Sequence, residues 1–205
     1  LAAPKDGWVE VEIEGGLAEV PRPSGFLMGR QRSLALESIR RLVRLATADA
    51  RVAGVIFTIK HLHVGSATAT SLRQILLDAR AKGKRVAVYL PDGGGTRETF
   101  VATGADLVVV GPETHLAPLG YAVQAQHFKA LLDKIGVEPD VLAKGRYKTA
   151  GEPQTRTHMS EAQREQLAAL LDVAFETLLE GLSTGRRVDR ATAERWVNEG
   201  PWSSK

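Results

Sequence analysis

The chain contains no cysteine among its 205 residues, and only 5% of its residues are aromatic. The absence of cysteine excludes disulfides, thiol catalysis and thiolate metal sites, although it leaves the compartment open. No stretch interleaves aromatic with basic side chains, as a platform for single-stranded nucleic acid requires, and the net charge of +3 is small. We therefore expect no nucleic-acid partner.

The chain also lacks a long apolar segment. No run approaches the about 20 apolar residues that span a bilayer, and no charged start followed by an apolar core resembles a signal peptide. The first residue is Leu1 rather than methionine. We therefore expect an upstream segment, such as a membrane anchor, in addition to these residues.

Several motifs of enzymes and metal sites are missing as well. The sequence has no HExxH, no GxSxG and no Walker loop. Gly93–Gly95 does not complete a GxGxxG pattern, so it is interpreted as a turn. His61 and His63 have no third ligand near them in the sequence, which favours a pair on a surface loop over a metal site. We predict no metal and no cofactor.

The remaining composition, 43% hydrophobic and 25% charged, is typical of a soluble globular protein, and the length fits one domain over residues 1–205. Residues 8–13 alternate, with Val9, Val11 and Ile13 on one face, as in a half-buried strand. Further strands are predicted at 17–20, 55–59, 85–90, 107–110 and 139–143, with helices at 34–48, 66–81, around 100–102, and at 128–135, 160–182 and 190–198.

This order of strands and helices indicates an α/β fold with a mostly parallel sheet and outer helices. An N-terminal part, 1–33, holds strands and a loop at 21–31, and a helical part, 159–205, closes the chain. Ser160 with Gln163 forms a capping box at the start of the longest helix, whose buried face is predicted to carry Leu167, Leu171, Ala174 and Leu178. Asp189 is the predicted cap of the last helix.

The stretch of most chemical interest is GRYKTAGEP at 145–153, which holds a lysine between an aromatic residue and a threonine. A lysine is ordinarily a solvated surface charge. Lys148 acquires a chemical role only if the fold buries it and removes its proton, because the neutral amine can then accept a proton from a hydroxyl nucleophile. The residues alone leave both interpretations open.

The surrounding motifs resemble those of the signal peptide peptidase family, also called protease IV. The similar stretches are HFKALLDKIG at 127–136, VLAKGRYKTAGEP at 141–153, MSEAQR at 159–164, ARAKGKRVAV at 79–88, ADLVVVGPET at 105–114 and WVNEGPWSS at 196–204. The resemblance covers most of the chain from about residue 34 onward. It implies a crotonase-like, or Clp protease-like, fold of repeated ββα units and the activity of a membrane-associated bacterial serine protease.

In that family a serine attacks the peptide bond while a neutral lysine takes its proton, and the lysine corresponds to Lys148. The resemblance also draws attention to Tyr147 and Thr149. Tyr147 and the apolar strand before it could shield the lysine amine from water. The family's nucleophile position corresponds to Thr96 in GGGTRETF, where Arg97 and Glu98 replace small residues. The oxyanion-hole turn of the family corresponds to KHLHVGSA, which lacks a Pro-Gly-Gly element.

These two departures from the family pattern, at the nucleophile and at the oxyanion-hole turn, are expected for the first half of a tandem protein. In such a protein one half carries the lysine and a homologous half carries the serine. We therefore expect half of a serine endopeptidase, with little activity alone, that acts on apolar signal-peptide remnants. The resemblance further implies a ring-like homo-oligomer in the bacterial cell envelope, associated with the membrane and outside the cytoplasm. One alternative is a catalytically inactive scaffold or peptide-binding module; a weaker one, suggested by the fold alone, is an acyl-CoA enzyme.

Overall fold

The computed structural model describes residues 6–21 and 34–204, so most of the loop predicted at 21–31 lies outside the described residues. The chain forms two compact units, one of residues 1–120 with 178–205 and one of residues 121–177, called unit 1 and unit 2 below. The helix α6 (Glu161–Arg186) runs from unit 2 into unit 1. The expectation of a single domain stays a prediction.

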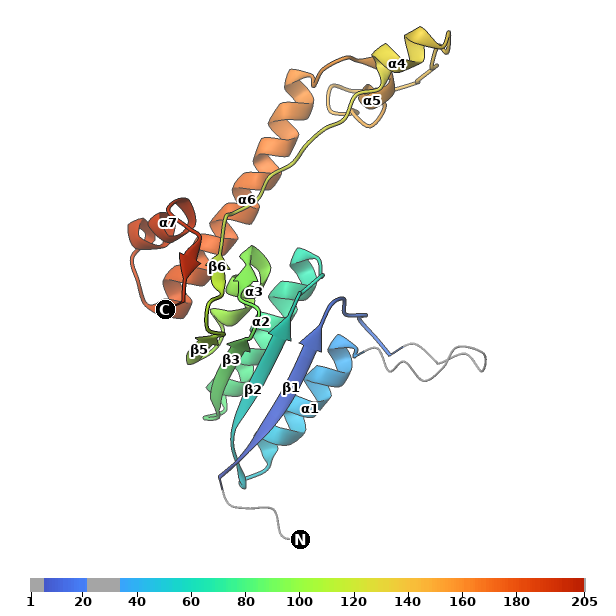
Figure 1. The fold of residues 1–205 in the computed structure, drawn as a ribbon. Helices are drawn as coiled ribbons and strands as arrows, with labels where there is room; N and C mark the ends of the chain where they lie inside the picture. Colours follow the sequence, from blue (N-terminus) through green and yellow to red (C-terminus); the bar gives the residue numbers. More distant parts are fainter. Residues whose placement is uncertain (1–5, 22–33, 205) are drawn as a thin grey trace. The chain divides into compact units, whose positions relative to one another are not determined.

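Unit 1 is built on a parallel sheet of four strands in the order β1, β2, β3, β5 (Figure 1). The strands are β1 (Gly7–Glu14), β2 (Val52–Lys60), β3 (Arg85–Leu90) and β5 (Leu107–Val110). Its helices are α1 (Leu36–Ala48), α2 (Ser66–Ala81), α3 (Thr96–Ala102) and α7 (Arg190–Asn198). The parallel sheet with outer helices confirms the α/β prediction.

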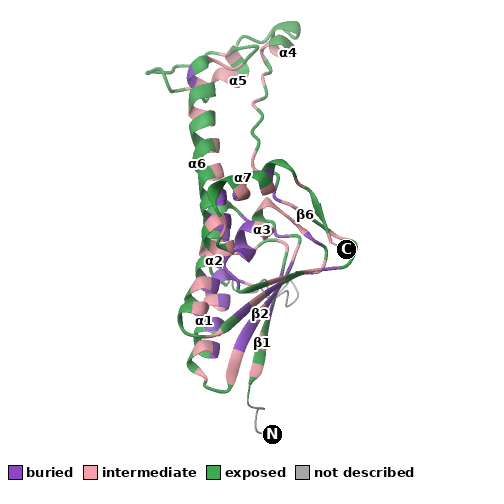
Figure 2. Cartoon of the chain, turned by 90° about the vertical axis from the view of Figure 1, so that its left-hand side faces the viewer, coloured by how far each residue is buried: buried purple, intermediate pink, exposed green. Residues whose placement is uncertain are grey.

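The core lies between this sheet and its helices. Figure 2 shows α1 and α2 against one face of the sheet, where the buried residues are concentrated. Val11 and Ile13 point to that face, as the alternation of residues 8–13 predicts, and Phe57 beside them has no exposed surface. A smaller sheet of β4 (Gly94–Gly95), β6 (His115–Ala117) and β7 (Trp202–Ser203) completes unit 1.

Unit 2 contains α4 (Lys129–Lys134), α5 (Glu152–Thr155) and the first part of α6. The prediction of a strand at 139–143 is wrong, because this segment pairs with no strand among the described residues and Leu142 is 97% exposed. The prediction of a strand at 17–20 is also wrong, because the structure places there a single bridge, between Ala18 and Ala35. Among the described residues, no helix is both long and apolar enough to cross a membrane.

The predicted helix termini are largely confirmed. The backbone N–H of Thr192 donates to Asp189 at 2.7 Å, which caps α7 and lowers the pKa of that carboxyl group. On α6, Leu178 is buried as predicted, whereas the three other residues of the predicted face, Leu167, Leu171 and Ala174, are only half-buried. The helix continues to Arg186, four residues past its predicted end.

Candidate active site

Lys148 lies in unit 2, directly after a turn at 145–147. Gly145 adopts a φ of 101°, which L residues rarely reach, and its carbonyl accepts the backbone N–H of Lys148 at 3.2 Å. The glycine therefore allows the chain to reverse just before the lysine.

The residues on both sides of Lys148 are tied to α6. The hydroxyl of Tyr147 lies 3.1 Å from each carboxylate oxygen of Glu165, to which Arg146 also donates at 3.1 Å. The hydroxyl of Thr149 donates to the side-chain oxygen of Gln166 at 3.0 Å. These contacts fix the backbone of the turn against successive residues of one helix.

The side chain of Lys148 is exposed, and it forms no side-chain hydrogen bond or ion pair with any residue that the structure describes. Tyr147 is 45% exposed and Val141 is 41% exposed. Among the described residues, therefore, neither Tyr147 nor the apolar segment before it encloses the amine. The turn presents the amine without burying it.

The start of α6 is held by a residue that the capping prediction did not include. The N–H of Gln163 donates to Ser160 Oγ at 3.1 Å, which confirms one half of the capping box. Glu152 of α5 then accepts both from Ser160 Oγ, at 2.6 Å, and from Ser160 N, at 3.3 Å. Glu152 thus takes the place predicted for the Gln163 side chain and joins α5 to α6.

Thr96 lies at the first position of α3 in unit 1, so it and Lys148 belong to different units. Its hydroxyl is partly buried and donates to the carbonyl of Gly120 at 3.0 Å. The residue is therefore held by its own unit through a hydrogen bond to backbone.

Glu98, two residues after Thr96, accepts two backbone N–H groups from separate segments. Leu62, in the loop after β2, donates at 2.8 Å, and Gly95, just before α3, donates at 3.0 Å. The two donors bind different carboxylate oxygens, Leu62 to Oε1 and Gly95 to Oε2, and the bond from Gly95 is a capping interaction at the start of α3. In KHLHVGSA, where the sequence predicted no donor pair, the N–H of Leu62 is bonded to a carboxylate of the same chain.

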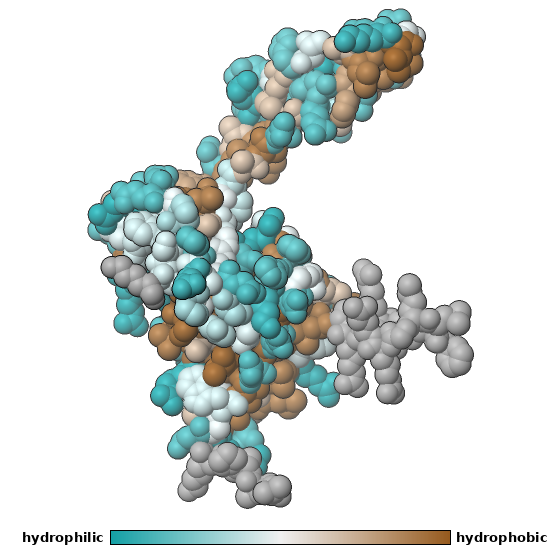
Figure 3. Space-filling view, viewed as in Figure 1, coloured by the Kyte–Doolittle hydropathy of each residue, from teal (hydrophilic) through white to brown (hydrophobic). Residues whose placement is uncertain are grey.

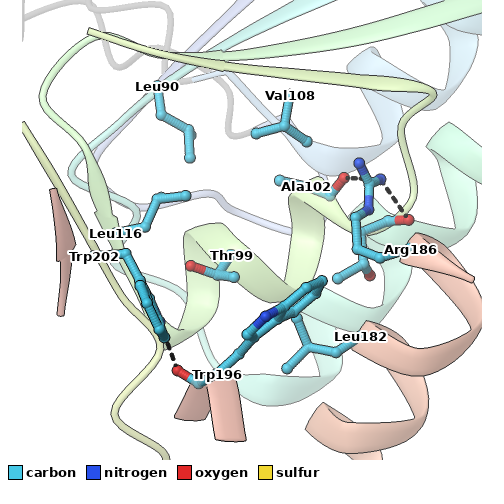
Figure 4. Close-up of a pocket in the computed structure, with 10 residues that line it drawn as sticks. Leu90, Thr99, Ala102, Val108, Leu116, Leu182, Arg186, Trp196 and Trp202 are labelled. Atoms are coloured by element: carbon cyan, nitrogen blue, oxygen red, sulfur yellow. Dashed lines mark hydrogen bonds between the residues drawn. The ribbon is translucent and has the colours of Figure 1, made fainter. Parts of the chain in front are cut away.

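A cavity of about 220 Å³ lies elsewhere in unit 1 and was not predicted (Figure 4). Its walls come from β3, α3, β5, β6, α6, α7 and β7: Leu90, Thr99, Ala102, Thr103, Val108, Leu116, Leu182, Arg186, Trp196 and Trp202. The indole N–H of Trp202 donates to the carbonyl of Trp196 at 2.9 Å. The cavity is mainly apolar, so it suits aliphatic or aromatic groups rather than a charged reaction centre.

Arg186 forms one side of this cavity and closes the end of α3. Its guanidinium donates to the carbonyl of Ala102 at 3.0 Å, to that of Thr103 at 3.1 Å and to that of Ala105. Burial is the main cause that lowers the pKa of Arg186. The carbonyl of Ala102 also accepts the N–H of Ala105 at 3.0 Å, so the guanidinium supplements the backbone bonds at the end of α3.

The two histidines of the predicted loop pair, His61 and His63, are both exposed. His61 Nε2 lies 3.5 Å from a carboxylate oxygen of Asp92. In the described part of the chain, no three side chains of the metal-binding types lie close enough together to hold an ion.

Comparison with known proteins gives matches of two kinds. The model of peptidase family S49 matches residues 78–205. The chain is 30% identical over 155 residues to the chloroplastic serine protease SPPA of Arabidopsis thaliana, covering 76% of this chain and 23% of that protein. It is 26% identical over 196 residues to Protease 4 of Salmonella typhi, covering 89% of this chain and 31% of that protein. The chain thus spans about a quarter to a third of these relatives.

Among solved structures, a membrane-bound stomatin-specific protease carrying a serine-to-alanine substitution resembles the chain, with a TM-score of 0.51 and 13% identity. The likeness covers 98% of this chain and 74% of that one. At this identity the likeness concerns the fold alone. Together with the parallel sheet and outer helices, it confirms the predicted crotonase-like α/β class.

Proposed function

This chain belongs to peptidase family S49, and from that premise we propose that it supplies the general-base lysine, Lys148, of a serine peptidase of the protease IV type. The nucleophilic serine comes from a homologous half or subunit. As that serine attacks the peptide carbonyl, its hydroxyl proton passes to Lys148 Nζ, and the amine later protonates the leaving group.

The observation that carries this proposal is the contrast between Lys148 and its neighbours. Tyr147 and Thr149 are anchored to α6, whereas the lysine amine is exposed and has no partner among the described side chains. A lysine amine is a base at neutral pH only when burial disfavours its charged form. The surface that buries the amine must therefore come from another part of the protein. The anchored turn holds the amine in a position to contact that surface.

Thr96 is a poor nucleophile in its present surroundings. Its hydroxyl donates to Gly120, and the nearby pair of backbone donors is taken by the carboxylate of Glu98. These two N–H groups are not available to an attacked carbonyl while Glu98 holds them. We therefore propose that the chain has little or no peptidase activity by itself.

The substrates that we propose are apolar segments of the kind that signal-peptide cleavage leaves in a membrane. A membrane-associated, ring-like homo-oligomer in the bacterial envelope, with this part outside the cytoplasm, would bring the lysine and the serine together. The membrane association is supported by the relatives named above, one of which is described as membrane-bound.

Reconstitution tests the proposal. The chain is assayed alone and after co-expression with a homologous serine-bearing half, using a fluorogenic apolar peptide. We expect no hydrolysis by the chain alone and hydrolysis by the assembly. Equal hydrolysis by the chain alone would contradict the half-enzyme proposal.

A scaffold or peptide-binding module is the second candidate, and the exposure of Lys148 is what favours it. On that interpretation the amine stays in solvent in the complete assembly, and substitution of Lys148 leaves hydrolysis by the assembly unchanged. The same reconstitution therefore separates the two candidates.

A further inference from the structure

The four strands of the main sheet in unit 1 begin at one end of the sheet, because they run parallel. The segments at this end contact one another. Lys84 Nζ donates to the carbonyls of Asp49 at 2.8 Å and Val52 at 2.6 Å, and the N–H of Gly7 donates to the carbonyl of Arg51 at 3.0 Å. Figure 1 shows the starts of β1 and β2 beside the end of α1. We call this surface, residues 6–8, 41–52, 80–85 and 103–106, the strand-start end.

The strand-start end carries an excess of positive charge. Its carboxylates belong to Asp6, Asp49 and Asp106, and its cations to Arg41, Arg44, Arg51, Arg80, Lys82, Lys84 and Arg85. Asp49 is paired with Arg51, and Asp106 with Arg80, each at 2.6 Å. Arg41, Lys82 and Arg85 are exposed and form no ion pair with any residue that the structure describes. No described carboxylate therefore neutralises these three cations.

The opposite end of the sheet, where the strands finish, carries an excess of negative charge. Within residues 12–14, 60–66, 91–98 and 111–115 the carboxylates belong to Glu12, Glu14, Asp92, Glu98 and Glu113, and the cations to Lys60 and Arg97. Lys60 is itself paired with Glu12 at 2.6 Å. The two ends of unit 1 thus differ in the sign of their excess charge, and such a distribution turns the positive end toward an anionic surface.

Two large apolar side chains are exposed at the strand-start end. Leu45, 63% exposed, lies in the last turn of α1, on the same helix face as Arg41 four residues earlier. Trp8, 41% exposed, lies in β1, and the guanidinium of Arg85 is 5.0 Å from the centroid of its ring. In Figure 3 apolar and hydrophilic surface adjoin at the lower end of unit 1. Apolar side chains set among cations, with a tryptophan beside them, are typical of proteins that lie on the headgroups of a membrane.

We propose that the strand-start end of unit 1 binds the surface of a membrane that contains anionic lipid. Arg41, Lys82 and Arg85 contact the lipid phosphates, and Leu45 and Trp8 enter the headgroup layer beside them. A nucleic acid would also attract the cations, but its phosphates offer no apolar contact to an aliphatic side chain such as Leu45. The carboxylates at the opposite end lie away from the negative charge of the membrane.

The proposal extends the membrane association proposed above. It requires neither Lys148 nor a serine, so its failure would leave the proposed peptidase chemistry untouched. The probe is a sucrose-loaded vesicle of phosphatidylglycerol and phosphatidylcholine in equal parts, and a vesicle of phosphatidylcholine alone is the control. We expect the chain to sediment with the first vesicle and not with the second. Binding should weaken as salt is added, because salt screens the attraction between exposed charges.

Matched variants locate the contact. Lys82→Glu combined with Arg85→Glu reverses two exposed charges of the strand-start end and should weaken binding at least tenfold. Lys134→Glu combined with Lys144→Glu makes the same change in net charge at exposed lysines of unit 2 and should weaken binding far less. Leu45→Ser leaves the charge unchanged and should weaken binding several-fold. Circular dichroism checks that each variant is folded.

Absence of binding to the anionic vesicles, or an equal loss of binding in the two double variants, would overturn the proposal. So would binding by Leu45→Ser equal to that of the parent chain. Equally tight binding of duplex DNA would overturn it as well, because the strand-start end would then recognise polyanions in general rather than a lipid surface.

Discussion

The hydroxyl of Tyr147 lies 3.1 Å from the carboxylate oxygens of Glu165, and this contact ties the turn before Lys148 to α6. Thr149, on the other side of the lysine, is bonded to Gln166 of the same helix. The amine of Lys148 is therefore presented from a backbone held on both sides. The side chain of Lys148 itself is exposed and has no hydrogen-bond or ion-pair partner among the residues that the structure describes.

Tyr147→Phe removes the hydroxyl that reaches Glu165. Both side chains are substantially exposed, so the bond contributes at most about 1 kcal/mol to stability. We expect the melting temperature to change little, the amides of 145–149 to exchange faster with deuterium, and hydrolysis by the assembly to fall several-fold. Tyr89→Phe, at a tyrosine of unit 1, is the control. Unchanged exchange at 145–149 would show that the hydroxyl does not hold the turn.

Thr96 offers a direct test of where the nucleophile lies. Thr96→Val removes the hydroxyl that donates to Gly120, and Thr96→Ser retains a hydroxyl. We expect both variants to keep most of the activity of the assembly, because the nucleophile belongs to the partner. Retention by the serine variant with loss by the folded valine variant would instead assign nucleophilic attack to Thr96.

Arg186→Met keeps much of the side-chain volume but removes a donor to the carbonyls of Ala102, Thr103 and Ala105 at the end of α3. The carbonyl of Ala102 keeps the N–H of Ala105, whereas the other two lose their bond to the guanidinium, so we expect unit 1 to lose about 1–3 kcal/mol of stability. Urea denaturation followed by circular dichroism measures the loss. Arg187→Met, at the exposed neighbouring arginine, should change stability much less.

The contribution of Asp49 to the stability of the fold depends on pH, and its direction follows from the pKa of this carboxyl group. Arg51 donates side-chain and backbone hydrogen bonds to this carboxylate and lowers its pKa from 3.8 to about 2. Because the folded-state pKa is depressed, the stabilisation is present above about pH 3.8 and is lost as the pH falls toward 2. Asp49→Asn should lower the urea midpoint at pH 6, and the difference from the parent should shrink below pH 3.8. A constant difference down to pH 2 would contradict this assignment.

The sequence predicted those elements that rest on local periodicity. The bounds of α2 and β3 agree to the residue, because regular apolar positions end at Gly83 or begin after it. Residues 139–143 have the composition of a strand, but a strand also needs a neighbour, and composition does not reveal whether one exists.

In the candidate site, too, the features that follow from a local motif were predicted, and the features that depend on distant contacts were not. The turn around Lys148 was found from its motif, whereas the exposure of the amine depends on which other surfaces pack there. The contact of Glu98 with Leu62 joins residues 36 positions apart, so no local pattern predicts it. Its contact with Gly95, three residues before, follows a capping pattern that the sequence does contain.

The central claim is that Lys148 is the general base of the assembled peptidase. The most direct measurement compares kcat/KM for apolar peptide hydrolysis by the assembly carrying Lys148→Ala with that carrying Lys144→Ala, at an exposed lysine four residues earlier. Loss of a catalytic base predicts a decrease of at least about a thousandfold for Lys148→Ala and little change for Lys144→Ala. Equal activity of the two variants, with assembly intact, would contradict the claim.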